Sequence, residues 1–366
     1  MEHRRERITS SIGFFNFARG CGIFFVIAYH SLIHFYPLTY QERIFGNFLP
    51  NLGAGLMVMF FIISGYGFYP QKNKKCIRTQ AKLLLKPYFI TVCMVLLAKL
   101  GLAIVERRSF WQFGGQYIFS YLLAVNEGWE GTILGLKVDN VAMFWFFWSL
   151  FGAWIIYNCI SRLKNESVKR VLVVCCVCLG WALTLVSKVW IYMIPDMLIV
   201  VGFLFIGHWM RESSWLEKTK LPAWEYFLLL FPAFITLAFG GIDMYSFTWI
   251  LGPLDLLGSV CLGLLLCRFF TWFAAFEIEN RATEIVSYMG FHTLWILCIH
   301  AFEEKVFPWY RLEFMFSGKK YLAVIVCFVL RCLVIWIGLR LIEFTGRIMK
   351  RKRKKNKRNR PQIVIE

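Results

Sequence analysis

The sequence predicts an all-α polytopic membrane protein with about ten transmembrane helices and both termini cytoplasmic. Of its 366 residues, 58% are hydrophobic and only 17% are charged, whereas charged residues make up about 25% of an ordinary soluble domain. The basic residues are also concentrated in every second segment between successive apolar stretches. A soluble globule of this size needs more polar surface than this chain offers, so soluble, disordered and disulfide-scaffold proteins are excluded.

Ten stretches of the chain are apolar over the length that crossing a bilayer requires, which is about 20 residues. The predicted spans lie near residues 12–36, 51–70, 86–105, 142–160, 171–189, 191–210, 222–241, 249–270, 287–306 and 321–344. The fifth and sixth spans are joined tightly, and Pro195 and Asp196 interrupt the sixth. The segment 106–141 is rich in aromatic residues, which favours an interfacial helix on the outer membrane surface.

The distribution of Lys and Arg sets the predicted orientation. With the N-terminus inside, the inside segments hold 28 of these residues and the outside loops hold 9. The stretch from Arg347 to Arg360 alone holds 10 of the 41, which is typical of a tail lying against an anionic membrane face. This tail has no aromatic side chains to stack on bases, which argues against a nucleic-acid partner. We therefore expect a transmembrane domain over 1–344 and a basic cytoplasmic tail over 345–366.

The 12 cysteines predict neither a disulfide framework nor a metal site. They lie in apolar stretches or in the basic loop near Cys76, away from the segments expected outside. Cys175, Cys176 and Cys178 are close together, but their setting, VLVVCCVCLGWAL, indicates small apolar packing residues of a helix. We expect no metal and no bound cofactor.

Ionisable side chains within a span are costly and therefore point to function. The first span has the densest set, with Arg19 and His30 on the same helical face because eleven residues make about three turns. They lie roughly 16 Å apart along the axis, and Asn16 and His34 fall near the same face. Snorkelling of Arg19 and a structural role for His30 are the alternatives. The shared face favours a functional site with His30 as its catalytic residue.

Other candidate residues lie in three later segments. In the second span, NLGAGLMVMFFIISGYGFY, the glycines indicate close helix packing, and Ser64 offers a hydroxyl to a ligand. Arg78 and Lys82 precede the third span with a spacing that stacks them on one helix face. They follow the positive-inside rule, or else bind phosphate. In the ninth span, His300 either pairs with Glu303 at i+3 as a local contact or belongs to the site.

Four runs occur in order along the chain: RGCGIFFVIAYH, FFIISGYGF, WFFWSLF and GFHTLWILCIH. Together they resemble the acyltransferase-3 family of integral membrane acyltransferases over the whole chain. That family opens with Arg-x10-His, continues with an FFxxSGF-like second span and a Trp-Phe-Leu-like fourth, and closes with GxxSxxIYxxH. Its Arg-x-x-Arg before the third span is matched only loosely by Arg78 and Lys82. Phe68 replaces a frequent Leu or Ile, and Leu297 replaces the Tyr of the last motif.

The resemblance implies ten or eleven helices that move an acyl group, often acetyl, from cytoplasmic acyl-CoA to a hydroxyl of a surface glycan or lipid-linked sugar. It implies a bacterial plasma membrane as the location and, in this sequence, no fused SGNH-type domain. Arg19 and His30 match the family's first motif, and a neutral His30 suits a general base. The residues expected to bind donor or substrate are Arg19, Ser64, Arg78, Lys82 and His300.

A transporter or flippase for glycans or anions is the alternative function. It would use the same intramembrane Arg19 and His30 as a substrate or proton site. The sequence shows neither inverted repeats nor clearly broken paired helices, which are typical of such transporters. The enzyme is therefore the favoured prediction.

Overall fold

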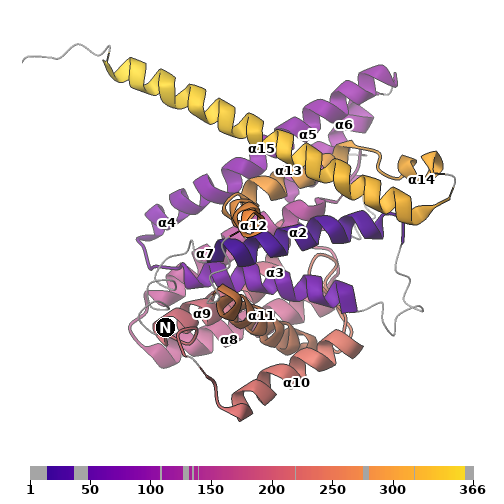
Figure 1. Cartoon of the computed structure of the whole chain (residues 1–366). Coiled ribbons are helices and arrows are strands. Elements are labelled where there is room, and N and C mark those ends of the chain that lie inside the picture. Colours follow the sequence, from indigo (N-terminus) through magenta and orange to yellow (C-terminus); the bar gives the residue numbers. More distant parts are fainter. Residues whose placement is uncertain are drawn as a thin grey trace, which may run out of the picture.

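The computed structural model describes residues 15–36, 48–107, 109–126, 132–133, 136–138, 140–218, 220–274, 280–316 and 318–358. These parts are almost entirely helical, and their only strands form two short antiparallel hairpins. Figure 1 shows the helices gathered into one bundle, with the long C-terminal helix crossing it. The prediction of an all-α polytopic membrane protein is confirmed.

The helices that contain the apolar stretches follow the predicted order. They are α2 (Asn16–Ile33), α3 (Phe48–Tyr66), α4 (Asn73–Gln80) continued by the π-helix η3 (Ala81–Leu85) and α5 (Lys86–Val105), α7 (Trp145–Ser161), α8 (Glu166–Val186), α9 (Ile194–Glu212), α10 (Ala223–Phe239), α11 (Pro253–Ala274), α12 (Arg281–Phe291), α13 (Thr293–Val306) and α15 (Lys320–Arg358). In the described parts, eight spans are long and apolar enough to cross a membrane, and α12 with α13 makes a ninth if the pair is one bent span. The remaining apolar helix, α10, has 17 residues.

The shorter elements lie between these helices. They are α6 (Phe110–Leu123), β1 (Thr132–Ile133), β2 (Leu136–Lys137), the 3₁₀ turns η4 (Ala142–Phe144) and η5 (Ile191–Met193), β3 (Ile242–Asp243), β4 (Thr248–Trp249) and α14 (Arg311–Met315). A helix was expected within 106–141, and α6 is that helix, packed against α5. The hairpin β3–β4 pairs Ile242 with Trp249 and Asp243 with Thr248.

The predicted span 287–306 is not one straight helix, because α12 and α13 meet at 77°. The break falls at His292, whose backbone angles (φ −97°, ψ 12°) leave the helical range. Helix α12 packs closely along α2, whereas α13 packs against α5 and α15. Hydropathy reports apolar length but no change of direction, so this bend was not predictable from it. Beyond the bend, α13 lies beside the C-terminal part of α2, where His300 contacts His30.

Helix α3 lies at the centre of the bundle, packed against α2, α9 and α11. Glycines allow this close packing. A methyl group at Gly207 of α9 would lie 1.9 Å from the carbonyl oxygen of Ile62, and one at Gly65 of α3 would lie 2.2 Å from that of Leu204. The interpretation of the second-span glycines as sites of close helix approach is therefore confirmed.

The two ends of the bundle differ in charge and structure. We call the end that carries α4 the basic end, and the end that carries β3–β4 the hairpin end. In both overall views, α4 and the C-terminal half of α15 extend towards the same side. Helix α15 continues past the predicted boundary at 344 to Arg358 without a break. The two chain termini themselves lie outside the described residues.

Candidate functional site

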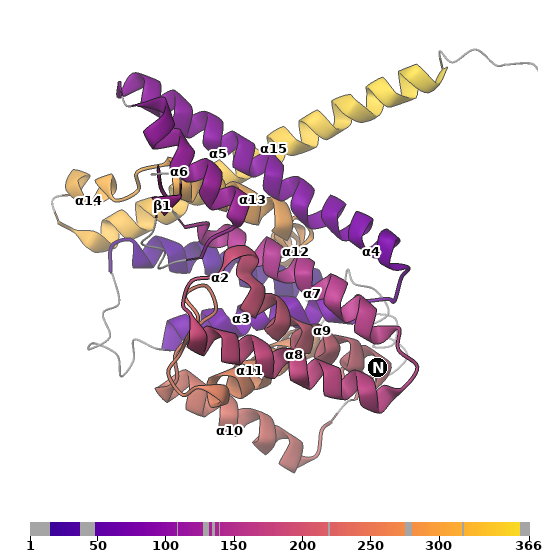
Figure 2. The same ribbon diagram turned by 180° about the vertical axis from the view of Figure 1, so that it is seen from behind.

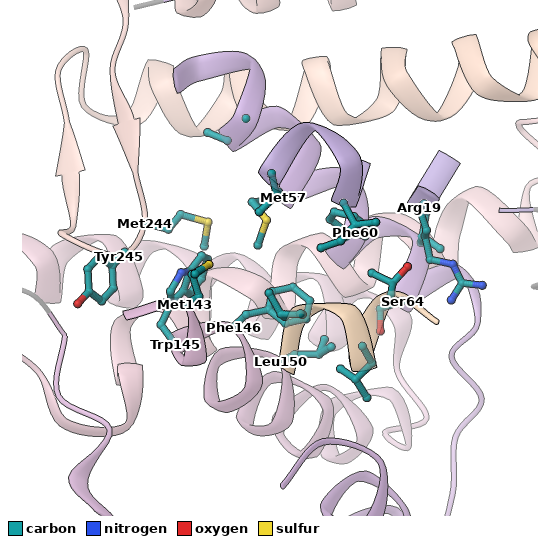
Figure 3. A pocket seen from close by; sticks show the side chains of 18 of the residues that line it. Arg19, Met57, Phe60, Ser64, Met143, Trp145, Phe146, Leu150, Met244 and Tyr245 are labelled. Carbon is teal, nitrogen blue, oxygen red and sulfur yellow. The ribbon is translucent and has the colours of Figure 1, made fainter. Parts of the chain in front are cut away.

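A cavity of about 950 Å³ runs through the bundle between α2, α3 and α7. Figure 3 shows its length, with Arg19 and Ser64 at one end and Met244 and Tyr245 of the β3–β4 hairpin at the other. Between these ends its wall is largely apolar. The side chains of this middle stretch include Ile23, Val26, Met57, Phe60, Phe146 and Leu150. The cavity therefore joins the two ends of the bundle through an apolar interior.

Arg19 and His30 both line this cavity, which confirms that they share one face of α2. Arg19 lies towards the basic end and donates from Nη2 to Oδ1 of Asn16 (2.5 Å). His30 lies three turns further along the same helix, so the cation and the imidazole face one space at different depths. The cavity thus has a cationic side chain near one end and an imidazole deeper along the same helix.

Ser64 of α3 also lines the cavity. Its hydroxyl oxygen accepts a hydrogen bond from the indole N–H of Trp154 on α7 (3.0 Å). The serine proton remains available to a ligand, because a hydroxyl both donates and accepts. Ser64 thus lies where it was expected, on the cavity wall close to Arg19.

Arg78 and Lys82 are exposed and do not line the cavity. The cavity faces the adjacent side of the same segment, through Gln80 and Leu84. This segment passes from α4 into the π-helix η3, whose wider turn departs from the 100° per residue on which the predicted stacking relied. The structure therefore brings Arg19 and Ser64 together but leaves the two basic residues at the rim.

His300 lies behind His30 and does not line the cavity. The two rings are in edge contact, with centroids 5.3 Å apart and planes at 65°. His300 is fully buried and donates from Nδ1 to Oε1 of Glu303 (2.5 Å). The predicted i+3 contact is thus confirmed. Nε2 of His300 is buried and has no hydrogen-bond partner in the part of the chain that the structure describes.

Sequence reasoning missed Arg331 of α15, one of the largest fully buried side chains. Its guanidinium contacts two carboxylates, with Nη1 3.2 Å from Oε1 of Glu303 and Nη2 2.7 Å from Oε2 of Glu304. The indole N–H of Trp309 donates to Oε2 of Glu303. His34 donates from Nε2 to Oε1 of Glu304 (2.7 Å). A single cation in the middle of the predicted span 321–344 was the signal that could have found this group.

Glu304 reaches the cavity wall beside His30, so the buried charges connect to the cavity. We define the charged cluster as His30, His34, His300, Glu303, Glu304 and Arg331. Its members come from α2 and its C-cap, from α13 beyond the bend, and from α15, and these three helices pack against one another. Both carboxylates of the cluster have a partner of opposite charge or a donor, which is what such burial requires.

The hairpin end of the cavity is held by the buried amide side chain of Asn51. Asn51 of α3 donates to the carbonyl oxygens of Thr236 (2.8 Å) and Gly240 (2.9 Å), and its own oxygen accepts from the N–H of Ile242 (3.1 Å). These bonds hold the start of the hairpin against α3. Met244 and Tyr245 are thereby presented at the end of the cavity.

Fold and site together define an integral membrane protein with a largely apolar cavity and an intramembrane histidine that lines it, the class to which membrane acyltransferases belong. The comparison with protein families gives the particular assignment. Residues 12–341 match the family described as Acyltransferase domain, so the chain belongs to the acyltransferase-3 family and is an O-acetyltransferase-like acyltransferase. No SGNH-type domain is matched. No curated protein and no solved structure gives a significant match.

Proposed function

We propose that this acyltransferase moves an acyl group, acetyl in the simplest case, from acyl-CoA at the basic end to a sugar hydroxyl at the hairpin end. The acceptor is a surface polysaccharide or a lipid-linked sugar. The observation that carries this proposal is the single cavity that presents Arg19 near one end and His30 deeper along the same helix. The membrane is the bacterial plasma membrane, with the basic end in the cytoplasm as the excess of Lys and Arg favours.

The chemistry follows from the order of groups along the cavity. Arg19 attracts the phosphates of CoA, and the apolar middle of the cavity suits the thioester-bearing arm. The thioester then reaches His30. A neutral His30 takes the proton of the sugar hydroxyl as the hydroxyl oxygen attacks the carbonyl carbon, a contribution of roughly 10²–10⁴ in rate. The C–O bond forms, the C–S bond breaks, and the CoA thiolate takes up the proton.

Release of free CoA thiol from acetyl-CoA tests this proposal. The purified full chain in lipid nanodiscs should release thiol and form an ester when octyl β-glucoside is added as the acceptor probe. No ion gradient exists in this preparation, so turnover separates an enzyme from the transporter alternative. Absence of thiol release with every glycoside and acyl-CoA supplied would refute the proposal.

Arg78→Ala and Lys82→Ala should raise the KM for acetyl-CoA and leave kcat nearly unchanged. Both side chains are exposed at the rim, where they would contact phosphates equally in the ground and transition states. An exposed ion pair contributes at most about 1 kcal/mol, which is a rise in KM of about two- to fivefold for each variant. Steady-state kinetics with varied acetyl-CoA measures it.

Lys164→Ala is the matched control, because Lys164 is an exposed lysine in the loop between α7 and α8 at the same end of the bundle. It should keep the wild-type KM. If Arg78→Ala and Lys82→Ala keep it as well, the basic residues of α4 and η3 serve membrane orientation alone.

A further inference from the structure

We propose that His300, oriented by Glu303 and charge-balanced by Arg331, is the proton acceptor behind His30. The imidazole of His30 then passes a proton inwards while it receives one from the acceptor hydroxyl. This inference rests on the proposed function and adds to it three positioning residues, His300, Glu303 and Arg331, that lie outside the cavity wall.

The geometry of the two imidazoles supports this pathway. With Nδ1 of His300 donating to Glu303, Nε2 carries the lone pair of the neutral ring. That atom is buried and without a hydrogen-bond partner in the described residues, and the ring to which it belongs is in edge contact with His30. Catalytic hydrogen bonds are often long in a free enzyme and tighten once substrate is bound. His300 is therefore a ready acceptor on the side of His30 away from the cavity.

The charges of the cluster favour the arrival of one proton. Glu303 and Glu304 together carry two negative charges when ionised, and Arg331 carries one positive charge. With His30, His34 and His300 neutral, the cluster holds one net negative charge. One proton on His300 makes it neutral, and the new imidazolium lies 2.5 Å from a carboxylate oxygen of Glu303. In a buried site this compensation is worth more than in water.

During acyl transfer the proton crosses both histidines and returns to sulfur. The hydroxyl oxygen forms the C–O bond and its proton moves to the cavity-facing nitrogen of His30. The proton on the other nitrogen of His30 moves to Nε2 of His300, so that His300 becomes an imidazolium with both nitrogens protonated. The C–S bond breaks and its electron pair leaves on sulfur. The proton returns from His300 through His30 to the thiolate, and both histidines are neutral again.

Two substitutions of Glu303 separate charge from shape. Glu303→Gln keeps the size of the side chain and an oxygen that accepts from His300, but it removes the charge. Glu303→Asp keeps the charge and shortens the side chain. We expect Glu303→Gln to lower kcat about tenfold or more and to move the acid limb of the pH–rate profile to lower pH, because the imidazolium loses its counter-charge. Glu303→Asp should keep the wild-type position of that limb.

If Glu303 had a purely structural role, Glu303→Asp should lose more activity than Glu303→Gln, since Gln is the closer match in shape. His300→Gln is an independent test of the inference, because it leaves both ion pairs of Arg331 in place. It should lower kcat by about 10² or more while the KM for acetyl-CoA stays within about twofold. His292→Gln is the matched control, because His292 lies at the bend, packed on Tyr288 away from the cluster.

Thiol release from acetyl-CoA with octyl β-glucoside gives kcat, KM and the pH profile for each variant in nanodiscs. The titratable and charged side chains in and next to the cluster all bear on this pH profile. They are His30 and His34 of α2 and its C-cap, Glu303 and Glu304 of α13, and Cys327 and Arg331 of α15. If Glu303→Gln and His300→Gln both kept the wild-type kcat and the wild-type position of the acid limb, the inference about His300 would be overturned and the proposed function would stand. A wild-type chain that releases no thiol would overturn the proposed function instead.

Discussion

His30→Ala should lower the rate of acyl transfer by about 10²–10⁴, because a positioned general base contributes that much. Among the three histidines of the charged cluster, only His30 lines the cavity, so neither His34 nor His300 can take its place there. The KM for acetyl-CoA should change little, since Arg19 remains near the basic end. Initial rates of thiol release measure the loss.

His30→Gln is the control for misfolding, because a glutamine side chain has a size similar to that of histidine and still forms hydrogen bonds. It should lose transfer as fully as His30→Ala. His34→Ala should be milder, since His34 donates to Glu304 one turn further along the chain, past the end of α2.

The rate of the wild-type enzyme should also fall with decreasing pH over the range in which His30 takes up a proton, because a base must be neutral to act. A wild-type rate in either His30 variant contradicts the mechanism.

Gly290→Ala should destabilise the protein through the contact between α12 and α2. A methyl group there would lie 1.6 Å from the carbonyl oxygen of Asn16 and 2.8 Å from the backbone nitrogen of Gly20. Backbone atoms cannot move aside as the end of a side chain can, so the helices must separate. Overpacking of this kind costs about 1–3 kcal/mol and occasionally more. The midpoint of thermal unfolding in detergent should fall, and transfer should fall with it because α2 carries Arg19 and His30.

Gly101→Ala is the control with the opposite expected sign. Nothing lies within 4 Å of a methyl group at Gly101 in α5, and alanine is favoured over glycine in a helix by about 0.5–1 kcal/mol. This variant should be as stable as the wild type or slightly more stable. Equal unfolding midpoints for Gly290→Ala and Gly101→Ala would contradict the packing described between α2 and α12.

The sequence was sufficient to predict what depends on local pattern. Apolar length placed a helix in each of the ten predicted spans, and helical periodicity placed Arg19 and His30 on one face. The contact between His300 and Glu303 also followed from spacing along one helix. These features involve neighbours within a few turns of the same element, so no knowledge of tertiary packing was needed.

The remaining features depend on contacts between distant segments. Arg331 meets Glu303 and Glu304 only where α15 packs against α13, and the bend at His292 lies where α12 packs on α2 and α13 on α5 and α15. The position of Arg78 and Lys82 at the rim depends on which side of α4 faces α7. Periodicity along a single segment cannot supply these relations, because it does not report which face meets which neighbour.

The apolar middle of the cavity has a consequence for the membrane as a permeability barrier. A passage that joins both ends of a transmembrane bundle is a potential leak for protons and ions. Here its wall between Arg19 and Glu304 is formed largely by apolar side chains such as Val26, Met57 and Phe60, and a hydrated ion loses favourable polar contacts on entering such surroundings. An acyl chain needs no hydration shell. Under the proposed function, the lining that suits the transferred group would also disfavour the passage of hydrated ions from one membrane face to the other.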